Sequence, residues 1–207
     1  LMKIVDGAWY AILVTIILCA IMYAWFHGNR TLAVQKNIHP ISLTHYLKNY
    51  YTKDAPTLPQ TALYLCRNYD HVPSSLLMHA HHNKYLHEKN IFITFSVTES
   101  PYVSQKERFR VSKPFSHSTF IEVFWGFKEH PSLIRVLTFL RTQKILSEEE
   151  QISILLSKGV PINYQTRFLK KFFNKIYIFL VSIAQNATDF YKIPNQNVIE
   201  IGVRYRI

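Results

Sequence analysis

An uncharged apolar run near the start of the chain constrains the fold more than any other feature of the sequence. The run covers Trp9–Phe26, with the sequence WYAILVTIILCAIMYAWF, and it contains no charged residue, glycine or proline. A helix of this length measures roughly 27 Å, close to the hydrocarbon thickness of a bilayer. Aromatic residues near both ends suit the two membrane interfaces. We therefore expect a transmembrane helix here.

A signal peptide or a buried core helix would fit this run less well. A signal peptide needs a basic region before the run and a small-residue cleavage site after it. Only Lys3 and Asp6 are charged before the run, and no Ala-x-Ala follows it. A buried core helix is usually shorter or has a polar face. The chain begins with Leu1, so a fragment of a longer protein is at least as expected as a start at Met2.

The distribution of basic residues predicts the orientation of the span. One basic residue, Lys3, precedes the run, and four follow it closely: Arg30, Lys36, Lys48 and Lys53. Because Lys and Arg concentrate on the cytoplasmic side, we expect the C-terminal side in the cytoplasm, with the span in the cell (inner) membrane.

A reducing compartment agrees with the two cysteines, Cys19 and Cys66, which we interpret as packed, unpaired thiols. The glycosylation sequons at Asn29 and Asn186 are then chance matches.

Composition allows one domain of ordinary size behind this span. The chain has 207 residues, 48% of them apolar, so a substantial core can form. Lys and Arg outnumber Asp and Glu by 24 to 13, which gives a net charge of +11. Such an excess suggests nucleic acid, anionic lipid or the cytoplasmic side of a membrane protein as the surroundings.

The remaining periodicities predict a mixed-sheet α/β domain. Helical spacing is expected at 39–51, 73–87, 131–141 and 167–186, the third with Leu133, Val136, Leu137 and Leu140 inward. Strands are expected at 61–67, 91–97, 107–112, 119–127 and 198–207, with a hairpin turn at Ser116–Ser118. Residues 54–60 hold two prolines and indicate a linker.

The segment 147–159 supports two predictions. Ser147 followed by Glu150 fits a capping box, which favours a helix. The alternation Ile152-Ser153-Ile154 favours a strand. Local signals leave both open.

Motifs for chemistry are scarce. There are only five glycines and no glycine-rich phosphate loop, no GxSxG elbow, no CxxC and no HExxH. No nucleophile, base and orienting group can be placed together, so we do not expect an enzyme and nominate no catalytic, cofactor-binding or metal residue.

The one cluster of titratable residues is HAHHNKYLHEKNIFITF, from His79 to Phe95, which has four histidines at its start. Zinc needs three or four ligands, and Glu88 is the one other ligand type at suitable spacing, so a metal site is disfavoured. The alternative is a set of surface or capping groups where a helix ends. We expect His82, Asn83 and His87 to hold the helix-to-strand turn by hydrogen bonds.

The helix expected at 167–186 combines basic residues with aromatic ones. Lys170, Lys171 and Lys175 lie beside an apolar stripe made of Phe168, Phe172, Ile176, Phe179 and Ile183. Nucleic-acid binding and contact with anionic lipid are both possible for such a helix. The preferred interpretation is a helix packed on the core through its stripe, with a solvated basic face.

Several motifs together resemble the KUP/HAK/KT family of potassium uptake permeases. The entry Asp6-Gly7-Ala8-Trp9 and the exit Trp25-Phe26-His27-Gly28 resemble the G-G-W and T-W-x-x-G ends of that family's last transmembrane helix. Further matches are Thr61–Leu65 to P-G-T-A-x-F-L, His82–Glu88 to H-N-K-x-L-H-E, Gly126–Pro131 to G-F-x-E-x-P, and Asn186–Gly202 to the R-N-A…F…P…V-x-E-x-G close. They occur in order along essentially the whole chain.

The chain departs from the family pattern at a few positions. Ala8, Gln60 and Gln185 replace the family's usual Gly, Gly and Arg, and Ser153–Lys158 is a loose version of its S-Y-F-L-x-R strand. That last likeness favours a strand in the ambiguous segment.

The resemblance implies a potassium importer that couples K⁺ entry to protons and carries a cytoplasmic C-terminal domain. Residues 1–30 would be the last transmembrane helix and its flanks, 31–60 a linker with a short helix, and 61–207 the cytoplasmic α/β domain. The ion pathway would lie in preceding membrane helices, so this piece would not transport alone. Expected partners are the lipid bilayer, K⁺ and H⁺ through the membrane core of the full-length protein, and a possible second copy, with no nucleic acid and no cofactor. The alternative is a stand-alone, membrane-anchored module for a nucleotide or anionic lipid.

Overall fold

A computed structural model of the chain describes residues 9–36, 41–51, 56–184, 190–193 and 197–207. The chain divides into two compact units. The first unit comprises Leu1–His39, Gly159–Ala184 and Arg204–Ile207, and the second comprises Pro40–Lys158 and Gln185–Val203. Part of the segment expected as one domain at 61–207 therefore belongs to the first unit.

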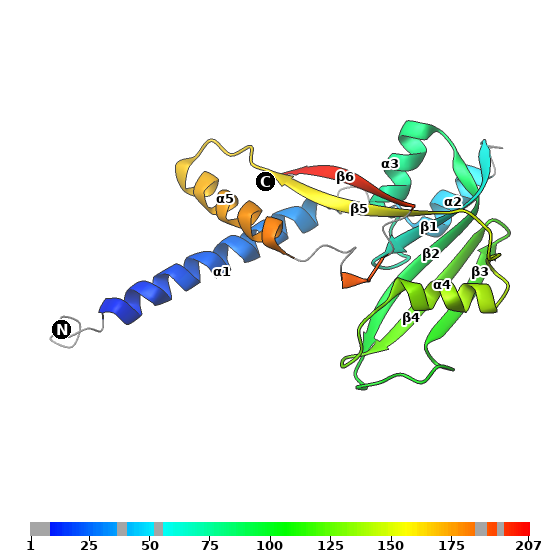
Figure 1. Ribbon diagram of the computed structural model, residues 1–207. Helices are drawn as coiled ribbons and strands as arrows, with labels where there is room; N and C mark the ends of the chain where they lie inside the picture. Colours follow the sequence, from blue (N-terminus) through cyan, green and yellow to red (C-terminus); the bar gives the residue numbers. More distant parts are fainter. Residues whose placement is uncertain (1–8, 37–40, 52–55, 185–189, 194–196) are drawn as a thin grey trace. The chain divides into compact units, whose positions relative to one another are not determined.

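The first unit is built on two helices, α1 (Trp9–Lys36) and α5 (Phe168–Ile183), which pack against each other (Figure 1). Within the described residues, α1 is the one helix long and apolar enough to cross a membrane, over Trp9–Gln35. Its hydroxyl at Thr15 donates to the Ala11 carbonyl inside the helix, so this polar group needs no outside partner. The expected apolar helix is present and continues past Phe26 to Lys36.

The second unit contains most of a six-stranded sheet with the order β3-β4-β2-β1-β5-β6. The strands are β1 (Thr57–Cys66), β2 (Leu86–Thr98), β3 (Phe109–Phe115), β4 (Ser118–Gly126), β5 (Ile152–Ile162) and β6 (Val198–Arg206). β1 pairs in parallel with β2 and β5, and β2 pairs in parallel with β4. β3 is antiparallel to β4, so the sheet is mixed as expected. The expected hairpin is confirmed, with its turn between Phe115 and Ser118.

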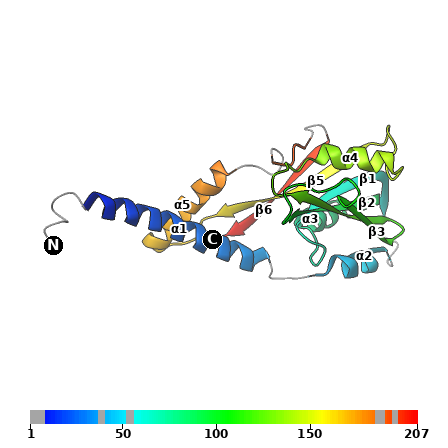
Figure 2. The same cartoon turned by 90° about the horizontal axis from the view of Figure 1, so that it is seen from below.

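Helices cover both faces of this sheet. α2 (Leu43–Tyr51) and α3 (Ser74–Asn83) lie on one face, and α4 (Leu133–Thr142) lies on the other, as Figure 2 shows for α2 and α4. Alternate residues of β1 enter the two cores: Tyr64 packs with α2 and α3, and Leu63 packs with α4. Burial on both faces explains why these strands are almost continuously apolar in sequence.

α4 agrees with its prediction in detail. The four residues expected to face inward are all buried: Leu133, Val136, Leu137 and Leu140. The ambiguous segment is the strand β5, as the family likeness indicated. The Ser147 amide still donates to the Glu150 carboxylate at 3.2 Å, so half of the capping box forms, in a turn rather than a helix.

The start of β1 differs from the one expected. β1 begins at Thr57 rather than Thr61, inside the expected linker. Its pairing with β2 shifts register between Leu58 and Thr61, and this irregularity accommodates Pro59, which cannot donate to a ladder.

The helix expected at 73–87 is too long by one turn. α3 ends at Asn83 because Lys84 adopts a left-handed conformation, with φ of 60°, while its amide donates to the Ala80 carbonyl. From Leu86 onward the backbone pairs with β1, so His87 belongs to β2.

Candidate functional site

Aromatic side chains join α1 to α5 near the end of the apolar run. The ring of Tyr23 meets Phe173 edge-on at 5.0 Å between centroids, and Trp25 lies 5.8 Å from Tyr177. The Tyr177 hydroxyl donates to the Asn29 side-chain carbonyl at 3.0 Å, which satisfies a polar group that burial would otherwise penalise.

Gly28 explains how closely the two helices approach. A Cβ built on Gly28 would overlap the ring of Tyr177, which is itself buried. The exit glycine of the apolar helix therefore has a packing role, since a larger residue would force the Tyr177 ring aside.

The orientation predicted for α5 is wrong. Of the five residues in its predicted stripe, Phe168, Phe172, Phe179 and Ile183 are exposed and Ile176 is half-buried. The buried residues are Asn174 and Tyr177: Tyr177 faces α1, and the side-chain amide of Asn174 donates to the Asn163 side chain at 3.4 Å. The helix is amphipathic as expected, but the apolar stripe does not face a protein core.

A buried ion pair closes the loop between β2 and β3 in the second unit. The guanidinium of Arg108 lies 2.6 Å from the carboxylate of Glu129, and their side chains are 7% and 12% exposed. The same guanidinium donates to the Val103 carbonyl at 2.6 Å. The other oxygen of Glu129 accepts from the amides of Gly126, at 2.9 Å, and Val103, at 3.4 Å.

These contacts set the charge state of the pair. The hydrogen bond from Arg108 is the largest of several effects that lower the pKa of Glu129 to about 2. Glu129 is therefore ionised at neutral pH.

Gly126 is required by the same loop. A Cβ at this position would overlap the backbone of Pro101, which cannot move aside as a flexible side chain could. The segment Gly126–Pro131, matched above only as a family likeness, thus supplies the glycine and the carboxylate of one structural clamp.

A cavity of about 750 Å³ opens beside the clamp. Its lining includes Arg108, Glu129, Arg135, Phe139 and Gln143. The guanidinium groups of Arg108 and Arg135 lie 4.9 and 5.7 Å from the ring centre of the buried Trp125. The volume lies within the range of small-molecule sites, but no single group in it points to a ligand class.

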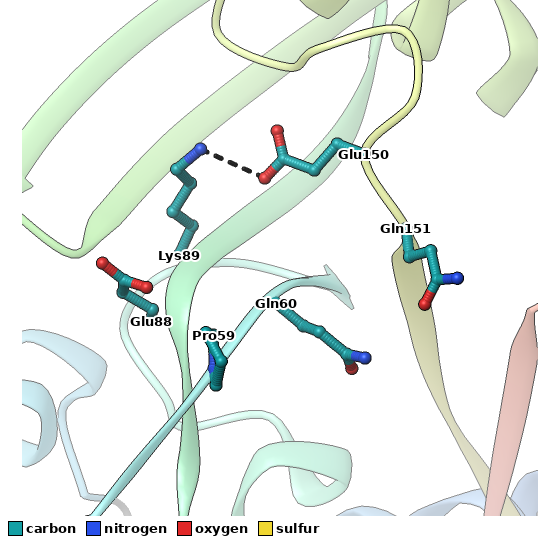
Figure 3. A pocket seen from close by; sticks show the side chains of 6 residues that line it. All are labelled: Pro59, Gln60, Glu88, Lys89, Glu150 and Gln151. Atoms are coloured by element: carbon teal, nitrogen blue, oxygen red, sulfur yellow. Dashed lines mark hydrogen bonds and ion pairs between the residues drawn. The ribbon is translucent and has the colours of Figure 1, made fainter.

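A second, smaller cavity of about 340 Å³ lies at the start of β1, β2 and β5 (Figure 3). Glu150 accepts hydrogen bonds there from Thr61 and from Lys89, the latter at 3.1 Å. Burial alone would raise the pKa of Glu150, but the hydrogen bonds from Thr61, Ser147 and Lys89 outweigh it and lower the pKa. The Glu150 carboxylate therefore already accepts its hydrogen bonds from protein groups.

The histidine cluster splits into a buried pair and an exposed pair. His79 and His87 are both buried and stack at 5.1 Å, and Tyr85 meets His79 edge-on. Burial lowers the pKa of both, to about 4 for His87, where the neighbouring His79 adds to the effect. His81 and His82 lie at the surface.

The hydrogen bonds expected from His82, Asn83 and His87 are not formed. Within the described residues their side chains make no hydrogen bond, and Nδ1 of His87 is buried without a partner. The left-handed Lys84 makes the turn instead, and the side chain of Asn90 bonds to the His87 carbonyl at 2.5 Å. No group of three His, Cys, Asp or Glu side chains is placed to hold a metal ion in the part of the chain that the structure describes.

Other predicted positions have mixed outcomes. Cys66 is half-buried, and burial raises the pKa of its thiol. Cys19 is exposed on α1, so its interpretation as a packed thiol is wrong. The sequon at Asn186 and the motif residues Asp6 and Gly7 lie outside the described residues.

Three residues with structural roles were not predicted from the sequence: Arg108, Tyr177 and Asn174. A signal existed for the last two: they are polar groups three residues apart on the side of α5 opposite its stripe. None existed for Arg108, whose partner is 21 residues away.

Comparison with known proteins finds relatives that align with the whole chain. The profile of the family described as K+ potassium transporter C-terminal domain matches residues 59–207. A probable potassium transport system protein Kup of Herminiimonas arsenicoxydans is 27% identical over 207 residues, covering 100% of this chain and 33% of that protein. The protein of the same description from Acidiphilium cryptum is 29% identical over 206 residues, with 100% and 33% covered.

A third relative, a probable potassium transport system protein Kup 3 of Rhizobium johnstonii, is 27% identical over 205 residues, covering 99% of this chain and 32% of that protein. The chain thus spans about a third of the length of the relatives it matches. No solved structure matches it significantly.

Proposed function

The chain belongs to the family of K+ potassium transporters, whose C-terminal domain covers residues 59–207, and from this premise we propose that it serves as the C-terminal part of a potassium uptake permease. In this role α1 anchors the chain in the cell (inner) membrane. The second unit is a cytoplasmic domain that supports or regulates the transporter. The match over residues 59–207, in a chain that begins with an apolar helix, is the observation that carries the proposal.

We assign the ion pathway to the part of the full-length transporter outside these 207 residues. A transporter binds its ion near the bilayer midplane, between several helices that alternate access. The apolar run Trp9–Phe26 has no charged side chain to mark such a site. The chain alone would therefore not transport K⁺, and any coupling of K⁺ to H⁺ would use groups elsewhere in the permease. A second copy as partner remains a prediction.

The orientation is tested by labelling single cysteines in intact cells. In a background of Cys19→Ala and Cys66→Ala, we expect Met2→Cys to react with a membrane-impermeant maleimide. Tyr102→Cys, at an exposed position of the second unit, should react only after permeabilisation. Reaction of Tyr102→Cys in intact cells would place the domain outside and refute the proposed topology.

A further inference from the structure

One face of α5 is a band of large apolar side chains left exposed. Phe168, Phe172, Phe179 and Ile183 are 81%, 51%, 63% and 65% exposed. At 3.6 residues per turn these four positions lie within about 60° of one another around the helix. Single exposed apolar residues are common, but a contiguous band of this kind marks an interaction surface.

Basic residues border this band. At the same helical spacing, Lys171 and Lys175 fall next to it along one flank, and both are exposed. α5 contains no acidic residue. Two copies meeting through the band would bring their lysines together and repel each other, whereas an anionic surface would attract them.

The contacts with α1 determine the level of α5 relative to the bilayer that α1 is proposed to cross. Its partners on α1 run from Tyr23 and Trp25, at the end of the apolar run, to Asn29, which Arg30 follows. In a membrane-spanning α1 this is the level of the lipid headgroups, where Tyr and Trp also concentrate. α5 is therefore held beside the bilayer surface.

We propose that α5 is an interfacial helix that binds the bilayer itself. Its apolar band inserts at the boundary of headgroups and acyl chains, and Lys171 and Lys175 pair with the phosphates of anionic lipids. Tyr177, on the opposite side, holds the helix to α1 through Asn29, and the neighbouring buried Asn174 bonds to Asn163. This inference rests on α1 crossing the membrane, as proposed above.

The test measures the depth of spin labels on the full chain reconstituted in vesicles of phosphatidylcholine with phosphatidylglycerol. Depth is given by collisions with oxygen, which concentrates in hydrocarbon, relative to collisions with a nickel chelate that stays in water. Labels are placed at Phe172→Cys and Phe179→Cys in a background of Cys19→Ala and Cys66→Ala. Ser182→Cys, exposed on the flank of the same helix where Lys171 and Lys175 lie, is the matched control. The native Cys19, with Cys66→Ala, separately gives the depth of α1.

We expect Cys19 and the labels at residues 172 and 179 to favour oxygen, and the label at residue 182 to favour the nickel chelate. If Cys19 favours oxygen while labels 172 and 179 behave like label 182, the interfacial helix is refuted and the anchor stands. If labels 172 and 179 meet neither reagent, the band is covered by protein, which also refutes lipid binding. If Cys19 favours the chelate, both the anchor and the inference fall.

The lysines are tested by replacing phosphatidylglycerol with phosphatidylcholine and by the double substitution Lys171→Glu and Lys175→Glu. We expect labels 172 and 179 to become shallower in either case, while Cys19 keeps its depth. An unchanged depth in both would refute the role of anionic lipid.

Discussion

The Arg108–Glu129 clamp yields the sharpest prediction of stability, because the chain offers a matched control. Glu129→Gln keeps the shape of the side chain but removes its charge, and leaves the Arg108 guanidinium, which is 7% exposed, without its counter-ion. Breaking one partner out of a buried pair costs about 3–5 kcal/mol. The side-chain amide introduced by Glu129→Gln also points its NH₂ group at another donor, either the Arg108 guanidinium or the Gly126 backbone amide, so one hydrogen bond is lost.

The control is the ion pair Arg110–Glu122, which lies on the neighbouring hairpin at 3.1 Å with side chains 73% and 32% exposed. Solvent screens such a pair, so Glu122→Gln should cost about 0–1 kcal/mol. The two substitutions change the same chemistry and differ in burial.

The free energy of unfolding is measured by urea titration of the detergent-solubilised chain, followed by tryptophan fluorescence. Trp125 reports on the clamp directly, since the guanidinium lies 4.9 Å from its ring. An unchanged slope with a lower midpoint indicates a change in stability alone. Equal costs for Glu129→Gln and Glu122→Gln would refute the view that burial makes this pair structural.

Three further predictions concern other parts of the chain. The pKa of His87 is about 4 when folded and 6.5 ordinarily, so the unfolded chain gains a proton first and stability should fall as the pH drops from about 6.5 to 4. When the urea midpoint is plotted against pH, His87→Phe should make the curve flatter between about pH 6.5 and 4. A curve as steep as that of the unsubstituted chain would contradict the burial of this imidazole. Gly28→Ala gains about 1 kcal/mol of helix propensity in α1, but forcing the Tyr177 ring aside costs about 1–3 kcal/mol. The packing of α5 on α1 should therefore weaken, and the backbone amides of α5 should exchange hydrogen faster. Slower exchange would show that the ring can relax. Glu150→Gln loses charged hydrogen bonds and should lower stability by about 1–3 kcal/mol by thermal melting, and no change would mean that water replaces them.

The sequence predicted those parts of the fold in which local pattern and burial agree. α4 is the clearest case, because its four inward residues follow helical spacing and are all buried. The mixed α/β architecture and the β3–β4 hairpin were predicted for the same reason. The family itself was identified from short motifs in order, which the profile match over residues 59–207 confirms.

Other features could not be predicted from local pattern. The spacing of the α5 stripe shows that the helix is amphipathic, but the spacing does not say whether lipid or protein meets its apolar side. Lys84 ends α3 in a left-handed conformation that Gly or Asn usually adopts, so nothing marked the helix end. Arg108 and Glu129 meet through the tertiary fold of the loop, across 21 residues.

Uptake of rubidium, a tracer for K⁺, tests the central claim most directly. The chain replaces the matching C-terminal third of the Acidiphilium cryptum relative, to which it is 29% identical, in cells without their own potassium uptake. Membrane insertion is checked for every protein. We predict that the chimera takes up rubidium, that the relative truncated before this third takes up less, and that the 207-residue chain alone takes up none. A chimera that reaches the membrane but performs no better than the truncated relative, or uptake by the chain alone, would contradict the account.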